Sequence, residues 1–283
     1  MQQEQLAEQL AARLERPILA ILADLDGVLT SGTQWRVPAA LFARLQAYAD
    51  AQPADPAIPR LAFNTGRPQP YVECMARHAH VSLPSLCEHG LVLWGPPGHE
   101  LLVHPKLPAS DLERMARVRR IAAERAALPG CRYHLEAGKI AEVTLIPRRP
   151  VRTEELVPEA EEIAALAGGG VRIDATFSVL TFMPPLLDKG AGMGWWCETT
   201  GIPAGQVAAV GDSWVDWSFL REAAVSFAPS NAVEEIRARV HIASDCRFGD
   251  VVLEMFEVIT AANRRILARS GAEAPCAGAP HDA

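Results

Sequence analysis

Residues 18–28 read Ile-Leu-Ala-Ile-Leu-Ala-Asp-Leu-Asp-Gly-Val, an apolar run that ends in two aspartates and a glycine. The apolar part, residues 18–23, is too short for an isolated helix and lacks polar alternation, which is typical of a strand buried on both faces of a parallel sheet. Asp24 and Asp26 follow this strand. In open α/β sheets ligands bind outside the carboxyl ends of the strands, so these two aspartates stand where a site is expected.

Three further apolar runs repeat this arrangement of a short strand followed by polar residues. They are Leu61–Phe63 before Asn64-Thr65-Gly66-Arg67, Val207–Val210 before Gly211-Asp212, and Ala224–Ala228 before Pro229-Ser230-Asn231. Because the carboxyl ends of parallel strands lie at one edge of a sheet, four such strands predict one composite site.

The middle of the chain has a different pattern and predicts a second domain. Hairpins are expected within residues 91–104 and 131–146, a basic helix at 110–127, a second helix before Gly168, and two short strands at 171–173 and 179–183. We therefore expect an α/β protein with a Rossmann-like parallel-sheet core, residues 1–104 and 187–270, and an inserted α+β cap domain, residues 105–186. Residues 271–283 are rich in Ala, Gly and Pro and are expected to form a disordered tail.

Composition and charge exclude several classes of protein. The chain has 34 acidic and 27 basic residues, a formal charge of −7, whereas binders of nucleic acid or anionic membranes usually carry the opposite sign. No apolar run reaches the ~18–20 residues needed to span a bilayer, and residues 1–16 lack the pattern of a signal peptide. Six scattered cysteines without a C-x-x-C pair fit thiols in a reducing compartment. We therefore expect a cytoplasmic protein.

The carboxylates of Asp24 and Asp26 are two residues apart in one turn and can face the same reacting centre. The first is suited to nucleophilic attack on phosphorus, because aspartate can form an acyl phosphate. The second is suited to general acid–base work on the leaving oxygen. Gly27 permits a sharp turn and lets backbone N–H groups approach an anion. The alternative interpretation is a capping and turn role, for which Asp and Gly are also common.

Two other segments predict contacts to a phosphate group. Thr65 and Gly66 offer a hydroxyl and N–H donors at a helix start, although Thr65 could serve only as a helix cap. Lys189 is one of only three lysines, with Lys106 and Lys139, and stands just before a predicted helix. There it can neutralise a phosphoryl oxygen, and a solvated surface lysine is the alternative.

A metal site is predicted from Asp212 and Asp216, which are four residues apart in the loop after the third strand. With Asp24 they form a cluster of hard oxygen donors of the kind that Mg²⁺ prefers, with positions left for water and a substrate phosphate. Helix capping by Asp212 is the alternative.

The motifs in this order resemble those of the haloacid dehalogenase superfamily of phosphohydrolases. The four segments are Asp24-Leu25-Asp26-Gly27-Val28, Asn64-Thr65-Gly66-Arg67, Asp188-Lys189-Gly190 and Gly211-Asp212-Ser213-Trp214-Val215-Asp216. Pro229-Ser230-Asn231-Ala232 is similar to the family's segment after the last catalytic strand. Cys87-Glu88-His89-Gly90 resembles the E-N-G segment of the subgroup with a large α/β cap, which includes Cof-type and sucrose-phosphate phosphatases. Val215 and His89 stand where that subgroup often has Asn.

The resemblance implies Mg²⁺-dependent hydrolysis of a small phosphomonoester, such as a sugar phosphate, through an aspartyl-phosphate intermediate. It implies that Asp24 is the nucleophile and Asp26 the acid and base. Thr65, Gly66 and Lys189 would hold the phosphate. The ligands of Mg²⁺ would be Asp24, the main-chain oxygen of Asp26, and Asp212. The supporting residues would be Asp216, Arg67 and Asn231.

Other functions are compatible with parts of the pattern. Dehalogenases of the superfamily lack the second acid, so Asp26 argues against halide chemistry. A phosphomutase or phosphotransferase with the same core stays open, and so does a non-catalytic sensor of a phosphorylated ligand. We expect no nucleic-acid or membrane partner, and a homodimer through the cap stays open.

Three further groups of side chains suggest additional binding functions. The arginine-rich helix at 110–127 could face an anionic substrate or an RNA, but a solvated amphipathic face is preferred. Trp35 and Trp214 could stack on a sugar ring. A zinc site is conceivable, although the spacing fits no standard finger; its ligands would come from Cys74, His78, His80, Cys87 and His89.

Overall fold

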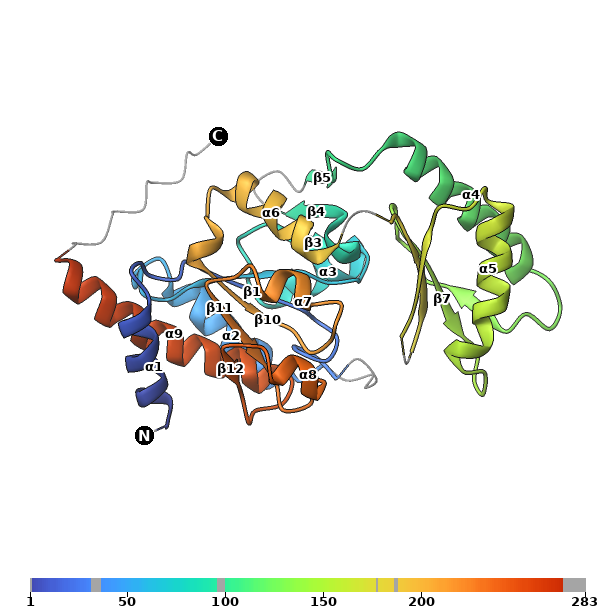
Figure 1. The fold of residues 1–283 in the computed structure, drawn as a ribbon. Helices are drawn as coiled ribbons and strands as arrows, with labels where there is room; N and C mark the ends of the chain where they lie inside the picture. The colour runs from blue at the N-terminus through green and yellow to red at the C-terminus, as the bar shows by residue number, and fades with distance from the viewer. Residues whose placement is uncertain (1, 32–36, 96–99, 177, 186–187, 272–283) are drawn as a thin grey trace.

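A computed structural model describes residues 2–31, 37–95, 100–176, 178–185 and 188–271 (Figure 1). Trp35 lies outside the described residues, as do residues 272–283 of the predicted tail and residues 186–187 at the predicted end of the cap. In the described part, no helix is both long and apolar enough to cross a membrane.

The core is a five-stranded parallel sheet with the strand order β12-β11-β10-β1-β2. Its strands are β1 (Ala20–Ala23), β2 (Arg60–Phe63), β10 (Val207–Val210), β11 (Val225–Ala228) and β12 (Ile242–Ala243). The chain passes from β1 to β2 on one side and returns as β10 on the other side of β1. The strand order therefore reverses beside β1, which is where open α/β sheets bind their ligands.

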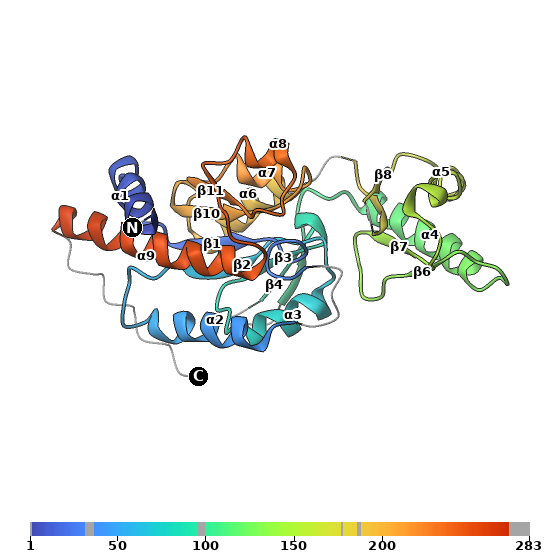
Figure 2. The same cartoon turned by 90° about the horizontal axis from the view of Figure 1, so that it is seen from below.

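Helices cover both faces of this sheet, as Figure 2 shows. One face carries α1 (Gln2–Arg13), α2 (Ala39–Ala51), α3 (Gln69–His78) and α9 (Gly249–Ser270). The other face carries α6 (Lys189–Thr200), α7 (Trp217–Leu220) and α8 (Glu234–Arg237), with the short helix η3 (Ala204–Gln206) before β10. The predicted Rossmann-like core is confirmed.

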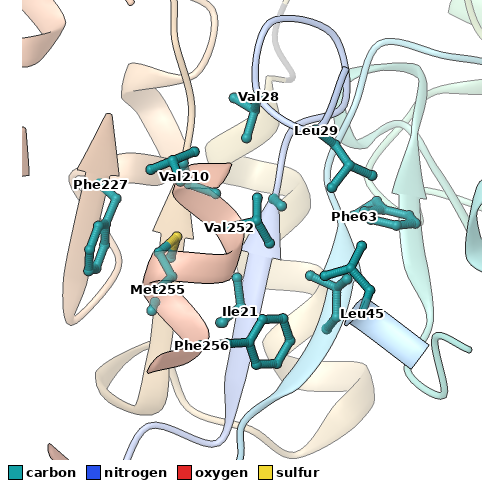
Figure 3. Packing of buried hydrophobic residues seen from close by; sticks show 14 of the residues in the cluster. Ile21, Val28, Leu29, Leu45, Phe63, Val210, Phe227, Val252, Met255 and Phe256 are labelled. Atoms are coloured by element: carbon teal, nitrogen blue, oxygen red, sulfur yellow. The ribbon is translucent and has the colours of Figure 1, made fainter. Parts of the chain in front are cut away.

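Apolar side chains of α9 lie directly on the sheet. Val252, Met255 and Phe256 of α9 pack beside Ile21 of β1, and all four are buried (Figure 3). Full burial of a side chain of this size contributes about 1.5–3 kcal/mol each. The hydrophobic effect on this face therefore holds the last long helix against the strand that carries Asp24.

A small antiparallel sheet extends the core beyond β2. It consists of β3 (Ser85–Cys87), β4 (Val92–Gly95) and β5 (Glu100–Val103), in that order. The predicted hairpin at 91–104 is confirmed as β4 and β5, whereas β3 was not predicted. The short helix η1 (Glu88–Gly90) joins β3 to β4. The N–H of Thr65 donates to the carbonyl of Leu86 at 3.0 Å, so η1 starts close to the polar end of β2.

The inserted segment forms a separate four-stranded antiparallel sheet in the order β6-β7-β9-β8. Its elements are α4 (Ala109–Ala126), β6 (Tyr133–Leu135), β7 (Val143–Pro147), η2 (Thr153–Leu156), α5 (Val157–Leu166), β8 (Arg172–Ala175) and β9 (Leu180–Met183). Helices α4 and α5 lie on the face away from the core (Figure 1), and their apolar side chains form a cluster with the sheet. We call this unit the cap; the predicted domain boundaries at 104/105 and 186/187 stay a prediction.

One predicted hairpin of the cap has a longer connection than expected. Strand β7 begins at Val143 and not at Ile140, and residues 136–142 form a loop that we call the cap loop. The N–H groups of Ile140, Ala141 and Glu142 donate to the carboxylate of Glu88 in η1, at 2.7, 2.7 and 2.9 Å. These donors bind the core, so they cannot extend the ladder between β6 and β7.

The basic helix is confirmed as α4, and several of its arginines bind within the cap. Arg117 Nε donates to the carbonyl of Ala167 at 3.0 Å, and Arg119 Nη2 donates to the carbonyl of Glu142 at 2.8 Å. Met115 and Val118 of the same helix are buried. The amphipathic interpretation of this helix is therefore preferred over an RNA-binding surface.

Candidate active site

The polar ends of three neighbouring strands meet at one edge of the core sheet. Asp24 follows β1, Thr65 follows β2, and Asp212 follows β10. In the described part of the chain, Asp24, Asp212 and Asp216 form a group whose carboxylate oxygens lie within 4.8 Å of one another. The structure thus brings the polar residues after these strands together at this edge.

Lys189 holds the carboxylates of this group together. Its Nζ lies 2.9 Å from Asp24 Oδ1 and 2.5 Å from Asp216 Oδ1, and all three residues are buried. Burial alone would lower the pKa of Lys189, but the two carboxylates outweigh it and raise the pKa above its usual value. This lysine is therefore a buried, permanently charged group and not a surface lysine.

The carboxylates remain in excess over this single cation. Burial raises the pKa of Asp24, and neighbouring acids add to the effect. Burial raises the pKa of Asp212 for the same reason, with repulsion from Asp216 and Asp24. Carboxylates held this close favour binding of a second cation, because a cation relieves both the repulsion and the loss of hydration.

The loop after β10 is shaped around Asp216. Its Oδ2 accepts hydrogen bonds from the N–H of Asp212 at 2.9 Å and from the N–H and the hydroxyl of Ser213, both at 3.0 Å. One carboxylate oxygen of Asp216 therefore binds the loop, and the other binds Lys189. Asp212 is left with its side chain directed at Gly27, where any side chain in place of the glycine would overlap the Asp212 carboxylate.

The segment after β2 is connected to the lysine through Asn64. Asn64 Nδ2 donates to the carbonyl of Lys189 at 3.1 Å, and Asn64 N donates to the carbonyl of Ala23 at 2.9 Å. Thr65 is buried next to it, and its Oγ1 accepts from the N–H of Arg67 at 3.2 Å. The hydroxyl hydrogen of Thr65 can still donate to an anion. Gly66 packs on the imidazole of His89, so a Cβ there would overlap the ring.

Asp26 and Arg67 form a pair beside the acidic group. Arg67 Nε lies 2.5 Å from Asp26 Oδ2 and Arg67 Nη2 lies 3.0 Å from Asp26 Oδ1. The side chain of Asp26 is therefore not part of the carboxylate group, which agrees with a predicted ligand role for its main-chain oxygen only. Asn231 Nδ2 donates to the carbonyl of Gly27 at 2.8 Å and so supports the turn that carries both aspartates.

The donor set fits Mg²⁺. The residues Asp24 and Asp212 offer hard carboxylate oxygens, and Mg²⁺ binds through one or two carboxylates while it keeps several waters or phosphate oxygens. The glycine at position 27 lets the Asp212 carboxylate lie directly against the turn that carries Asp24 and Asp26, since a Cβ there would overlap it. Sulfur and imidazole donors, which softer metals prefer, are not in this group.

A second charged cluster joins the cap loop to the core. The sequence patterns pointed to Glu88 and His89 in this cluster but not to its glutamates on the cap loop. Besides the three N–H bonds to Glu88, His89 Nδ1 lies 2.8 Å from Glu142 Oε1, and Lys139 Nζ lies 3.0 Å from Glu142 Oε2. Burial would raise the pKa of Glu142, but His89 and Lys139 outweigh it and hold the pKa at about 2. Lys139 could have been suspected as one of three lysines, whereas Glu136 and Glu142 gave no sequence signal.

The raised pKa of Glu88 predicts that the stability of the fold depends on pH. Burial, with repulsion from Glu142, raises its pKa from 4.5 to about 7. Between these values the folded protein holds a proton on Glu88 that the unfolded chain has lost. The stabilisation is complete below pH 4.5 and is lost as the pH rises through 7.

We therefore expect Glu88→Gln to flatten the pH profile of the unfolding free energy. The unfolding free energy of the wild type minus that of the variant should fall by up to about 3 kcal/mol as the pH rises from 4.5 to 7. One pKa unit corresponds to about 1.4 kcal/mol. Denaturant unfolding at several pH values measures it, with Glu161→Gln on the exposed side of α5 as the control. Parallel profiles for wild type and Glu88→Gln would contradict this assignment.

The remaining predicted groups have structural partners. Cys74 Sγ lies 3.9 Å from His78 Nδ1 on α3, while Cys87 is buried in β3, and none of the five possible zinc ligands is in the metal-compatible group of the described residues. Trp214 is exposed, and the guanidinium of Arg239 lies 5.0 Å from its ring centroid. One face of the Trp214 ring is therefore in contact with this arginine, and sugar stacking stays a prediction.

Comparisons with known proteins agree with this geometry. A family model described as haloacid dehalogenase-like hydrolase matches residues 148–256. A phosphoglycolate phosphatase of Pyrobaculum neutrophilum is 37% identical over 95 residues, which are 32% of this chain and 42% of that protein. Another phosphoglycolate phosphatase, of Pyrobaculum aerophilum, is 30% identical over 99 residues, 35% of this chain and 43% of that protein. The matched segment thus spans less than half the length of these relatives.

Solved structures share the fold over most of the chain. A haloacid dehalogenase-like hydrolase from Bacteroides thetaiotaomicron has a TM-score of 0.63 at 18% identity, covering 87% of this chain and 98% of that chain. The sucrose-phosphatase of Synechocystis, solved with sucrose and phosphate, has a TM-score of 0.55 at 15% identity and covers 86% and 98% of the two chains. At these identities the likeness establishes the fold, including the cap, and the predicted architecture is confirmed.

Proposed function

We propose that the chain is a haloacid dehalogenase-like hydrolase, and that it acts as an Mg²⁺-dependent phosphatase that forms a phosphorylated Asp24. The observation that carries the proposal is the arrangement at the carboxyl edge of β1. Asp24 is paired with Lys189 at 2.9 Å, while Asp26, two residues later, is held apart from it by Arg67. Two carboxylates with different surroundings support two different roles.

In this proposal Asp24 attacks the phosphorus atom, and the bond to the leaving oxygen breaks. Asp26 gives a proton to that oxygen and then takes one from the water that attacks the aspartyl phosphate. Lys189, the hydroxyl of Thr65 and the N–H of Gly66 would neutralise the transferring phosphoryl oxygens. Positioning and neutralisation of charge supply most of the rate in phosphoryl transfer.

Mg²⁺ would be held by Asp24, Asp212 and the main-chain oxygen of Asp26. When bound, it would offset the negative charge of the phosphoryl group and of the carboxylates. Asp216 and Asn231 would keep the two loops in place, through the bonds to Ser213 and Gly27 described above.

The names of the relatives suggest a substrate class. We propose a sugar phosphate or a similarly small phosphomonoester, located between the core and the cap sheet. Two relatives are named phosphoglycolate phosphatases and a structural neighbour is a sucrose-phosphatase, so both kinds of compound belong in the test.

The proposal is tested by release of phosphate from a panel of phosphomonoesters with and without Mg²⁺. We expect turnover of p-nitrophenyl phosphate and of at least one sugar phosphate or phosphoglycolate, and loss of turnover in EDTA that returns when Mg²⁺ is added. Retention of the phosphoryl group in a rearranged product would favour a phosphomutase. No Mg²⁺-dependent release from any member of the panel would contradict the proposal.

A further inference from the structure

We propose that Glu136, on the cap loop, determines which leaving groups the site accepts and selects those without negative charge. This inference rests on the proposed phosphatase function and adds a specificity-determining residue to it. It starts from Arg67, a cation beside Asp26 at the side of the site where the leaving group would be protonated.

Each of the three nitrogens of the Arg67 guanidinium donates to a carboxylate. Nε and Nη2 donate to the two oxygens of Asp26 at 2.5 and 3.0 Å, and Nη1 donates to Glu136 Oε1 at 2.9 Å. The charges of Asp26 and Glu136 hold the pKa of Arg67 above its usual value although burial opposes this. An incoming carboxylate would therefore meet a cation whose charge is already balanced by two carboxylates.

Glu136 is itself held by a second cation. Its Oε2 lies 3.4 Å from Lys139 Nζ, and the Glu136 side chain is 13% exposed. Lys139 is also shared with Glu142 at 3.0 Å. A substrate carboxylate that replaced Glu136 would have to break contacts to two cations at once.

The cap loop cannot easily move Glu136 away. Its far end is bound to the core by three N–H bonds to Glu88 and by the pair of His89 and Glu142, and Arg119 donates to the carbonyls of Ile140 and Glu142 at 3.1 and 2.8 Å. A Cβ at Gly138 would touch Pro70 of α3, so the middle of the loop also lies on the core. The position of Glu136 is therefore fixed relative to Asp26.

The part of the site where the leaving group would lie therefore contains two carboxylates, those of Asp26 and Glu136, bound to the single guanidinium of Arg67. A sugar hydroxyl can donate a hydrogen bond to the carboxylate oxygens of Glu136 and is not repelled by their charge. The carboxylate of a substrate such as phosphoglycolate has no hydrogen to donate and is repelled. Removing the charge of Glu136 would remove this repulsion and leave Arg67 with one fewer balancing charge, which favours an anionic leaving group.

The test compares kcat/KM for a neutral sugar phosphate and for phosphoglycolate in wild type and Glu136→Gln. We expect the wild type to prefer the sugar phosphate and the variant to shift the ratio at least about tenfold toward phosphoglycolate, an effect typical of a lost or gained charge contact. Glu136→Asp keeps the charge and should retain the wild-type preference. Glu161→Gln, exposed on α5, is the matched control and should leave the ratio unchanged.

The outcomes separate this inference from the function on which it rests. A wild type that hydrolyses both compounds, with a ratio that Glu136→Gln leaves unchanged, overturns the role of Glu136 and leaves the phosphatase intact. A wild type that prefers phosphoglycolate overturns it as well. Absence of hydrolysis of p-nitrophenyl phosphate by the wild type would instead contradict the proposed function, and the inference with it. Equal thermal unfolding of the variants excludes misfolding as the cause.

Discussion

Asp24→Asn is expected to lower kcat for phosphate release by about 10⁴-fold or more, the size of effect seen when a catalytic nucleophile is removed. An amide nitrogen and oxygen cannot attack phosphorus as a carboxylate does, and they bind a divalent cation poorly. The fold should persist, because the change is isosteric and Lys189 keeps its ion pair with Asp216. Phosphate release from p-nitrophenyl phosphate measures the effect.

A control at the same edge of the sheet makes this result specific. Asp245 follows β12 and is exposed, so Asp245→Asn changes the net charge by the same amount outside the carboxylate group. We expect wild-type turnover from that variant. If Asp24→Asn kept more than about a tenth of the wild-type rate, Asp24 would not be the nucleophile.

Lys189→Met is expected to destabilise the protein by about 3–5 kcal/mol, the cost of leaving buried charge without its partner. Lys189 contacts Asp24 and Asp216, whose side chains are 9% and 0% exposed. Domains are stable by only about 5–15 kcal/mol, so this loss would bring the variant close to unfolding. Denaturant unfolding monitored by tryptophan fluorescence measures it, and activity should be lost as well.

The double variant Lys189→Met with Asp216→Asn distinguishes this cause from lost packing. Removal of one unpaired carboxylate should recover part of the stability, and a positive coupling in the double-mutant cycle is expected. Lys106→Met, at an exposed position, should have little effect. A Lys189→Met variant as stable as Lys106→Met would show that the ion pairs carry no net stability.

The fold and the catalytic edge could be predicted because they depend on local patterns. The run at residues 18–23 has no polar alternation, which specifies a buried parallel strand, and β1 begins at Ala20 as part of it. The order of β1, β2 and β10 brings Asp24, Thr65 and Asp212 to one edge without any knowledge of side-chain contacts. The contact of Asp216 with Lys189 did not follow from these patterns, and it is a finding of the structure.

The contacts between cap and core could not be predicted from pattern. The sequence pattern at 131–146 predicts a second hairpin strand that starts at Ile140. In the structure the N–H of Ile140 donates instead to the buried carboxylate of Glu88, 52 residues away. A tertiary partner of this kind overrides local strand propensity. Glu88, His89 and Gly90 have φ angles of 50°, 53° and 90°, so the turn that presents Glu88 is set by the fold around it.

The central claim, a phosphoryl group carried by Asp24, is tested most directly by trapping it. In Asp26→Asn the attacking water loses its base, while p-nitrophenyl phosphate still phosphorylates the enzyme because its leaving group needs no acid. The variant is mixed with this substrate and Mg²⁺, quenched in acid and treated with borohydride, which reduces an acyl phosphate to an alcohol. We expect peptide mass spectrometry to find homoserine at position 24. Release of nitrophenol with unmodified Asp24, or with the modification at another residue, would contradict the account.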